Sequence, residues 1–189
     1  MGVLSLIILF SLEIPVLVNP NHPARPHYFA MRWPLLPHAI FGIFSILAGP
    51  VQFSSRVRRN YPKLHRVIGR LYVGSIMISA PMGAVIVLAL PEDNNFRIGV
   101  CVHATLWFIT TLMAFLTARN RQILQHKQWM VRSYVLTFSF IVTRILGPVW
   151  NALHISHHDY GIVDVMLNVA YLLVADIGLN WREITTKRA

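Results

Sequence analysis

Six long apolar segments follow one another along the chain, separated by short polar connections. A helix needs about 20 apolar residues to cross roughly 30 Å of hydrocarbon, and most of the segments reach that length. The period-2 alternation of strands is absent, and helices satisfy their own backbone groups in lipid. The sequence therefore predicts an all-α polytopic membrane protein, one domain with six transmembrane helices, of which the second to fifth form a central four-helix bundle. The segments are residues 3–18, 35–55, 64–90, 98–118, 129–153 and 161–179.

The uneven distribution of lysine and arginine predicts how the helices are oriented. Residues 56–63, residues 119–128 and the C-terminal tail are rich in these cations, whereas residues 91–97 and 154–160 contain only Arg97. Connections rich in lysine and arginine stay on the cytosolic side. We therefore expect an integral protein of the plasma membrane or an energy-transducing membrane, with both termini on the inner side.

The first apolar segment is short and contains Glu13 and Pro15. It lacks the basic start and the small-residue cleavage site of a signal peptide. We therefore expect it to be retained as a helix.

Composition narrows the possible function classes. Only 13% of the residues are charged, against about 25% in soluble domains, and the mean hydropathy is +0.53. The net charge of +10 lies in cations between apolar segments, so membrane lipids are expected partners and nucleic acid is not. A single cysteine, Cys101, excludes an internal disulfide and any cysteine-based metal site.

A polar signature at the start of the third apolar segment returns at the start of the fifth. KLHRVIGRLYV (Lys63–Val73) and QHKQWMVRSYV (Gln125–Val135) each place a histidine a few residues before Arg-x-Tyr-Val. The two helices run in the same direction, so His65 and His126 are expected at one depth on the inner side. His38 and His103 stand near the outer ends of the second and fourth helices. The other histidines fall in outer loops, where we expect them to be solvated: His22, His27, His154, His157 and His158.

Two imidazoles that face each other across a helical bundle can supply both axial ligands of a haem iron. The sequence therefore indicates one or two haem b groups, an outer one between His38 and His103 and an inner one between His65 and His126. Iron binds neutral imidazole through one nitrogen, and the other nitrogen needs a partner. Cations on the inner side are expected to bind the haem propionates; they are Arg66, Arg70 and Arg132.

Another interpretation of the same residues stays open. Histidine, arginine, lysine and aromatic residues are common at the headgroup level of membrane proteins, and such clusters at cytosolic helix ends also suit lipid phosphates. A non-catalytic, lipid-binding subunit of a larger membrane complex is therefore one alternative. A small transporter built from repeated helix pairs is another, although the spans contain few polar residues.

Arg144 lies several turns inside the fifth apolar segment, where a charge is costly and needs a partner. Asp164, Asn168 and Tyr171 share one face of the sixth segment, because they are spaced by four and three residues. Pairing of Arg144 with this face is the structural interpretation. The functional ones are a clamp for a propionate of the outer haem, or a proton or quinol site.

The segments GPVQF, LHRVIGRLYV and HKQWMVRSYV, followed by Arg144, resemble an uncharacterised and chiefly bacterial family of multi-pass membrane proteins, domain of unknown function 2306. The resemblance extends from about Pro37 to Pro148. One histidine on each of four consecutive helices is more loosely similar to the cytochrome b-561 type of di-haem electron carriers. That resemblance implies electron transfer across a membrane, from quinol or another reductant, by the chain alone or as a subunit of a redox complex.

Overall fold

The computed structural model describes residues 19, 29–152, 154, 156 and 159–185. Every regular element in these residues is a helix, and they contain no strand. The predicted all-α class is therefore confirmed for the described part of the chain. The first predicted span, residues 3–18, lies outside the described residues, as do His22, His27, His157 and His158.

The described helices follow the predicted spans closely. Their bounds are α4 Arg32–Phe53, α5 Ser55–Asn60, α6 Pro62–Ala89, α7 Asn94–Arg119, α8 Ile123–Ala152 and α9 Tyr160–Thr185. Four helices are long and apolar enough to cross a membrane, namely α4, α6, α7 and the part of α9 from Tyr160 to Trp181. The 30-residue α8 does not meet that standard over its described residues. The structure thus supports four membrane spans, and the count of six membrane spans stays a prediction.

Local sequence explains where the chain turns at both ends of α6. After α4 the backbone becomes extended at Ser54, whose hydroxyl accepts a hydrogen bond from the Val57 N–H at 3.3 Å. Pro62 then occupies the first turn of α6, where its missing N–H costs nothing. On the far side, the Asp93 carboxylate accepts from the Asn95 N–H at 2.8 Å and caps α7.

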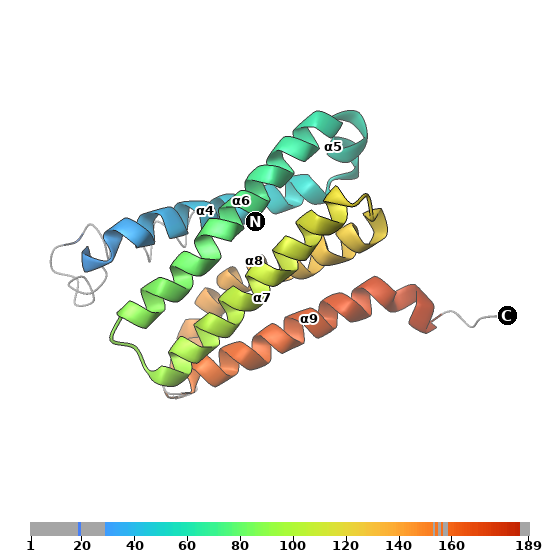
Figure 1. Cartoon of the computed structure of the whole chain (residues 1–189). Helices are drawn as coiled ribbons and strands as arrows, with labels where there is room; N and C mark the ends of the chain where they lie inside the picture. Colours follow the sequence, from blue (N-terminus) through green and yellow to red (C-terminus); the bar gives the residue numbers. More distant parts are fainter. Residues whose placement is uncertain (1–18, 20–28, 153, 155, 157–158, 186–189) are drawn as a thin grey trace.

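Four of the helices form a closed cycle of contacts. In it α4 packs on α6, α6 on α7, α7 on α8, and α8 more lightly on α4, while α9 lies outside the cycle against α7 and α8. Figure 1 shows that α5, the α7–α8 connection and the C-terminal end of α9 lie at one end of the molecule. The α6–α7 connection and the N-terminal end of α9 lie at the other end. Two of the lysine- and arginine-rich regions, residues 56–63 and 119–128, are therefore gathered at one end, called the basic end below.

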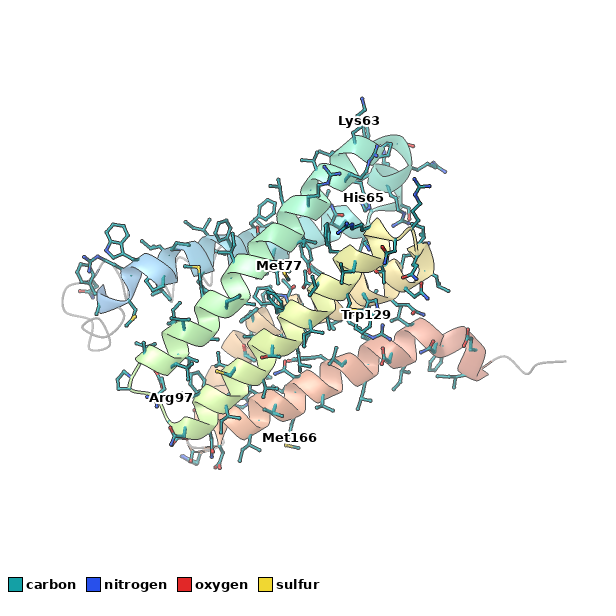
Figure 2. The ribbon with its side chains drawn as sticks, in the orientation of Figure 1. Lys63, His65, Met77, Arg97, Trp129 and Met166 are labelled. Atoms are coloured by element: carbon teal, nitrogen blue, oxygen red, sulfur yellow. The ribbon has the colours of Figure 1, made fainter. Side chains whose placement is uncertain are left out.

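Large apolar side chains cover the outside of the helices. Ile40, Leu88 and Val174 are 62%, 58% and 69% exposed, and Figure 2 shows Met166 pointing away from the other helices. Water would penalise so much exposed apolar surface, whereas lipid tails accept it. The outer surface therefore fits contact with membrane lipids.

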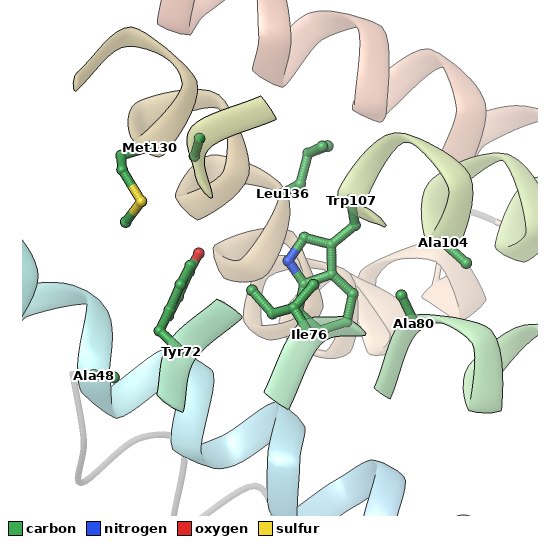
Figure 3. Close-up of a cluster of buried hydrophobic side chains, with 9 residues drawn as sticks. Ala48, Tyr72, Ile76, Ala80, Ala104, Trp107, Met130 and Leu136 are labelled. Carbon is green, nitrogen blue, oxygen red and sulfur yellow. The ribbon is translucent and has the colours of Figure 1, made fainter. Parts of the chain in front are cut away.

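The centre of the cycle combines apolar packing with a closed group of hydrogen bonds. Trp107, Tyr72, Ile76 and Leu136 are all almost completely buried, and Figure 3 shows Tyr72 and Trp107 directed into the space between the helices. The Tyr72 hydroxyl lies 2.9 Å from Ser133 Oγ and 3.0 Å from Thr137 Oγ1. The hydroxyl cluster, as we call it, comprises Tyr72, Trp107, Thr111, Ser133 and Thr137.

Two glycines allow α7 and α9 to approach closely. A Cβ added to Gly99 would lie 2.7 Å from the carbonyl oxygen of Gly161 and 2.9 Å from its Cα. A Cβ added to Gly161 would overlap the backbone carbonyl of Asn95. Any side chain at either position would therefore push the two helices apart.

Candidate functional site

A cavity at the basic end contains both histidines of the repeated signature. It has a volume of about 600 Å³ and is lined by residues of α4, α6, α7 and α8, among them Gln52, His65 and His126. An adjoining cavity of about 530 Å³ shares these three residues. Figure 2 shows His65 at the same end as Lys63, with Arg97 at the opposite end. The structure thus brings together the two histidines predicted to form an inner pair.

The two cavities are rich in cations. Arg66, Arg70 and Arg119 line the first, and Arg58 and Lys127 join Arg66 around the second. Neither set of lining residues contains an aspartate or a glutamate. The rest of the first cavity is largely apolar, with Gly69, Val73, Ala114, Phe115, Ala118 and Met130. The cavities therefore suit a ligand that is both apolar and acidic.

The His126 ring is held by a backbone oxygen. Its Nδ1 lies 2.8 Å from the carbonyl oxygen of Ala114, and a carbonyl can only accept a hydrogen bond. Nδ1 therefore carries the hydrogen, and in the neutral ring Nε2 keeps its lone pair. This is the arrangement of a metal-binding histidine, in which the second nitrogen is fixed by an oxygen.

The environment of His65 is different. Its carbonyl oxygen accepts a hydrogen bond from Gln52 Nε2 at 3.2 Å. Its ring Nδ1 is buried and has no hydrogen-bond partner among the described residues. No hydrogen bond to a described residue therefore fixes the tautomer of His65, in contrast to His126.

The three segments that carry the family resemblance meet around this cavity. A Cβ on Gly69 of LHRVIGRLYV would lie 3.0 Å from Gln52 Oε1 of GPVQF, so the absence of a side chain leaves room for the amide. The ring of Tyr134, from HKQWMVRSYV, lies directly against Gly49. Its hydroxyl donates to the carbonyl oxygen of Ile46 at 3.2 Å. Small residues in one segment therefore accommodate large ones in another.

Arg132, predicted to bind a haem propionate, contacts α9. Its Nε donates to Asp176 Oδ1 at 2.8 Å, and a second guanidinium nitrogen lies 2.7 Å from the same oxygen. The guanidinium carbon of Arg132 lies 4.9 Å from the centre of the Trp129 ring. Arg132 lines neither cavity. It joins α8 to α9, while Arg119, not predicted from the sequence, takes a place in the cavity wall.

The outer histidines each hydrogen bond to a different helix. His38 Nδ1 lies 2.8 Å from the carbonyl oxygen of Ser79 on α6. His103 Nδ1 lies 2.6 Å from Asn168 Oδ1 on α9. Neither histidine lines the two cavities at the basic end. A haem shared by His38 and His103 stays a prediction.

The polar face of α9 contacts α7. Asn168 binds His103 and donates from Nδ2 to Asp164 Oδ2 at 3.3 Å, and the Tyr171 hydroxyl is buried without a partner among the described residues. Arg144 belongs to α8, but its side chain lies outside the described part. Its predicted pairing with this face therefore stays a prediction, and no sequence pattern indicated the contact between Asn168 and His103.

The chain matches the model of a known protein family. The family described as Predicted membrane protein (DUF2306) matches residues 35–178. The chain belongs to this family. No curated protein and no solved structure matches the chain. The family match covers all three interlocking segments and the histidines on α4, α6, α7 and α8, and it agrees with the apolar outer surface: the protein is a membrane protein.

Proposed function

We propose that this protein binds haem b at the basic end and acts as a membrane electron-transfer protein. The observation that carries the proposal is the composition of one cavity wall, which holds two imidazoles, three arginines and otherwise mainly apolar side chains around about 600 Å³. Ligand cavities in proteins commonly measure about 300–1,000 Å³ and are mainly apolar. A second haem, in the other half of the membrane, belongs to the same proposal.

The residues of the cavity fit the chemical parts of haem b. His126 would bind the iron through Nε2, because its Nδ1–H is held by the Ala114 carbonyl. His65 offers the second imidazole from α6. Arg66, Arg70 and Arg119 line the cavity and would bind the two propionates by charge-assisted hydrogen bonds.

A haem bound in this cavity would supply one-electron redox chemistry. The chain would hold it between α6 and α8, keep the macrocycle among apolar side chains, and tune its potential through the axial histidines and the nearby arginines. Quinol or another reductant, and further subunits of a membrane redox complex, are the proposed electron donors and acceptors.

A second candidate function is the binding of anionic lipid at the same end. Arg58, Arg66 and Lys127 surround the adjoining cavity of about 530 Å³, and a lipid phosphate needs such cations without competing carboxylates. In that case the protein would be a structural subunit whose basic end holds headgroups. The two functions differ in a simple property, since only the first makes the purified protein coloured.

The test is a reduced-minus-oxidised absorption spectrum of the protein purified from haem-replete cells, with the haem-to-protein ratio. His126→Asn should remove the inner haem and so halve the ratio of a two-haem protein, or abolish that of a one-haem protein. His154→Asn changes an exposed histidine outside both cavities and should keep the wild-type ratio.

A wild-type protein without haem refutes the proposal, as does equal haem content in the two variants. If the wild-type protein has no haem, lipid analysis decides whether the second function applies. Preferential co-purification of anionic over zwitterionic lipid with the wild type, and loss of this preference in Arg66→Gln, would identify the lipid-binding function.

A further inference from the structure

We propose that Asn168 of α9 is a positioning residue that holds His103 ready to bind a haem iron through Nε2. The inference rests on the proposed function, because it assigns a ligand and its support to the haem in the half of the membrane away from the basic end. It gives α9, which lies outside the helix cycle, a part in cofactor binding.

The direction of hydrogen bonding sets the tautomer of His103. Asn168 Nδ2 donates to the carboxyl oxygen of Asp164 at 3.3 Å, so the amide nitrogen faces Asp164 and the amide oxygen faces His103. The His103 Nδ1 atom, 2.6 Å from that oxygen, must therefore carry the hydrogen. His103 Nδ1 thus donates to Asn168, and Asn168 Nδ2 donates to Asp164. In the neutral His103 ring, Nε2 keeps its lone pair.

The same contact sets the direction of the ring. The two nitrogens of an imidazole point to nearly opposite sides, and Nδ1 points toward α9, outside the cycle of α4, α6, α7 and α8. Nε2 therefore points toward the interior of that cycle. The ring is 5% exposed, and Phe140 packs edge-on against it with ring centres 4.7 Å apart. Asn168 itself is completely buried, so the contact is sheltered from water.

The Nε2 atom of His103 is an acceptor that lacks a partner. It is buried and makes no hydrogen bond to any described residue, and a buried polar atom without a partner is costly. A ligand that accepts a lone pair would remove that cost. The described residues contain no group of three or more metal-binding side chains, which disfavours an ion held by protein ligands alone. A haem iron needs only one or two axial side chains.

The test has a readout that does not need haem. In haem-free protein labelled with ¹⁵N-histidine and reconstituted in lipid nanodiscs, the His103 ring should carry its hydrogen on Nδ1, identified by comparison with His103→Gln. Asn168→Leu should abolish this preference, and Asn168→Asp, which retains an oxygen acceptor, should restore it. Asn180→Leu removes an asparagine of the same helix whose side chain donates to the Asp176 carbonyl and should change nothing.

Haem binding is measured on the same variants. Loss of the residue that hydrogen bonds to a metal-binding histidine typically weakens binding roughly 10–100-fold. Asn168→Leu should therefore lose the outer haem on dilution and keep the inner haem, which is the one that His126→Asn removes. A wild-type His103 with its hydrogen on Nε2 overturns the inference without any variant. Unchanged haem binding by Asn168→Leu, in a protein whose wild type holds two haems, overturns it while leaving the proposed function standing. A wild type without haem overturns both.

Discussion

The close approach of α7 and α9 through Gly99 can be tested by adding a single methyl group. In Gly99→Ala the new Cβ would lie 2.7 Å from the carbonyl oxygen and 2.9 Å from the Cα of Gly161. Both are backbone atoms, which cannot turn aside as a side chain can. The helices must therefore separate by several tenths of an ångström, because carbon atoms pack at about 3.5–4.0 Å.

The magnitude follows from two opposing terms. Overpacking by one carbon costs about 1–3 kcal/mol, and replacing glycine by alanine within a helix gains about 1 kcal/mol. Gly178→Ala provides the matched control, since Gly178 is exposed in α9 and its added Cβ would meet no atom within 4 Å. Both variants gain the helix term, so the difference between them isolates the overpacking cost of about 1–3 kcal/mol.

The assay is reversible unfolding in mixed micelles of a mild detergent and SDS, together with thermal denaturation. With about 2–4 °C of Tm per kcal/mol for a chain of this size, Gly99→Ala should unfold about 2–12 °C below Gly178→Ala. If the two variants unfold at the same temperature, the backbone contact between Gly99 and Gly161 does not limit the distance between these helices.

Two further predictions concern the membrane-embedded core and the orientation of the chain. Tyr72→Phe removes the hydroxyl that bridges α6 and α8, and unfolding in mixed micelles should show that the free energy of unfolding falls by about 1–2 kcal/mol. Hydrogen bonds between membrane helices contribute about 0.6 kcal/mol each on average, and here the partners are left buried. An unchanged free energy of unfolding would contradict this. In a chain with Cys101→Ser, cysteines replacing Asn60 and Asn120 should react with an impermeant thiol reagent from the same side of the membrane, and one replacing Glu92 from the other; labelling of all three from one side would refute the arrangement of Figure 1.

Much of the fold was accessible from the sequence, because length and apolar character determine which segments cross a membrane. The third apolar segment, predicted at residues 64–90, is the helix Pro62–Ala89. Hydropathy fails where a helix continues into polar residues. α7 begins at Asn94, four residues before the predicted start, because Asp93 caps its polar first turn. α8 likewise begins at Ile123, within a connection that was predicted to be a loop.

The candidate site was only partly predictable. The repeated signature placed His65 and His126 at one depth, and both line one cavity. The partners of individual side chains depend on how each helix is rotated about its axis, which helix periodicity alone does not determine. Arg132 was therefore assigned to a cofactor although α8 turns it toward Asp176. The contact between Asn168 and His103 was missed for the same reason.

The hydroxyl cluster has a consequence for what can move through the protein. Its members are almost completely buried, and their hydrogen bonds are made to one another or to the backbone: Tyr72 to Ser133 and Thr137, Trp107 Nε1 to Thr137 at 2.8 Å, and Thr111 to Ser133 at 2.7 Å. A hydrated ion or a polar solute passing between α6, α7 and α8 would have to break these bonds. The space between these three helices is thus closed by hydrogen bonds within the protein, so a path for a hydrated solute would have to open the hydroxyl cluster or lie elsewhere.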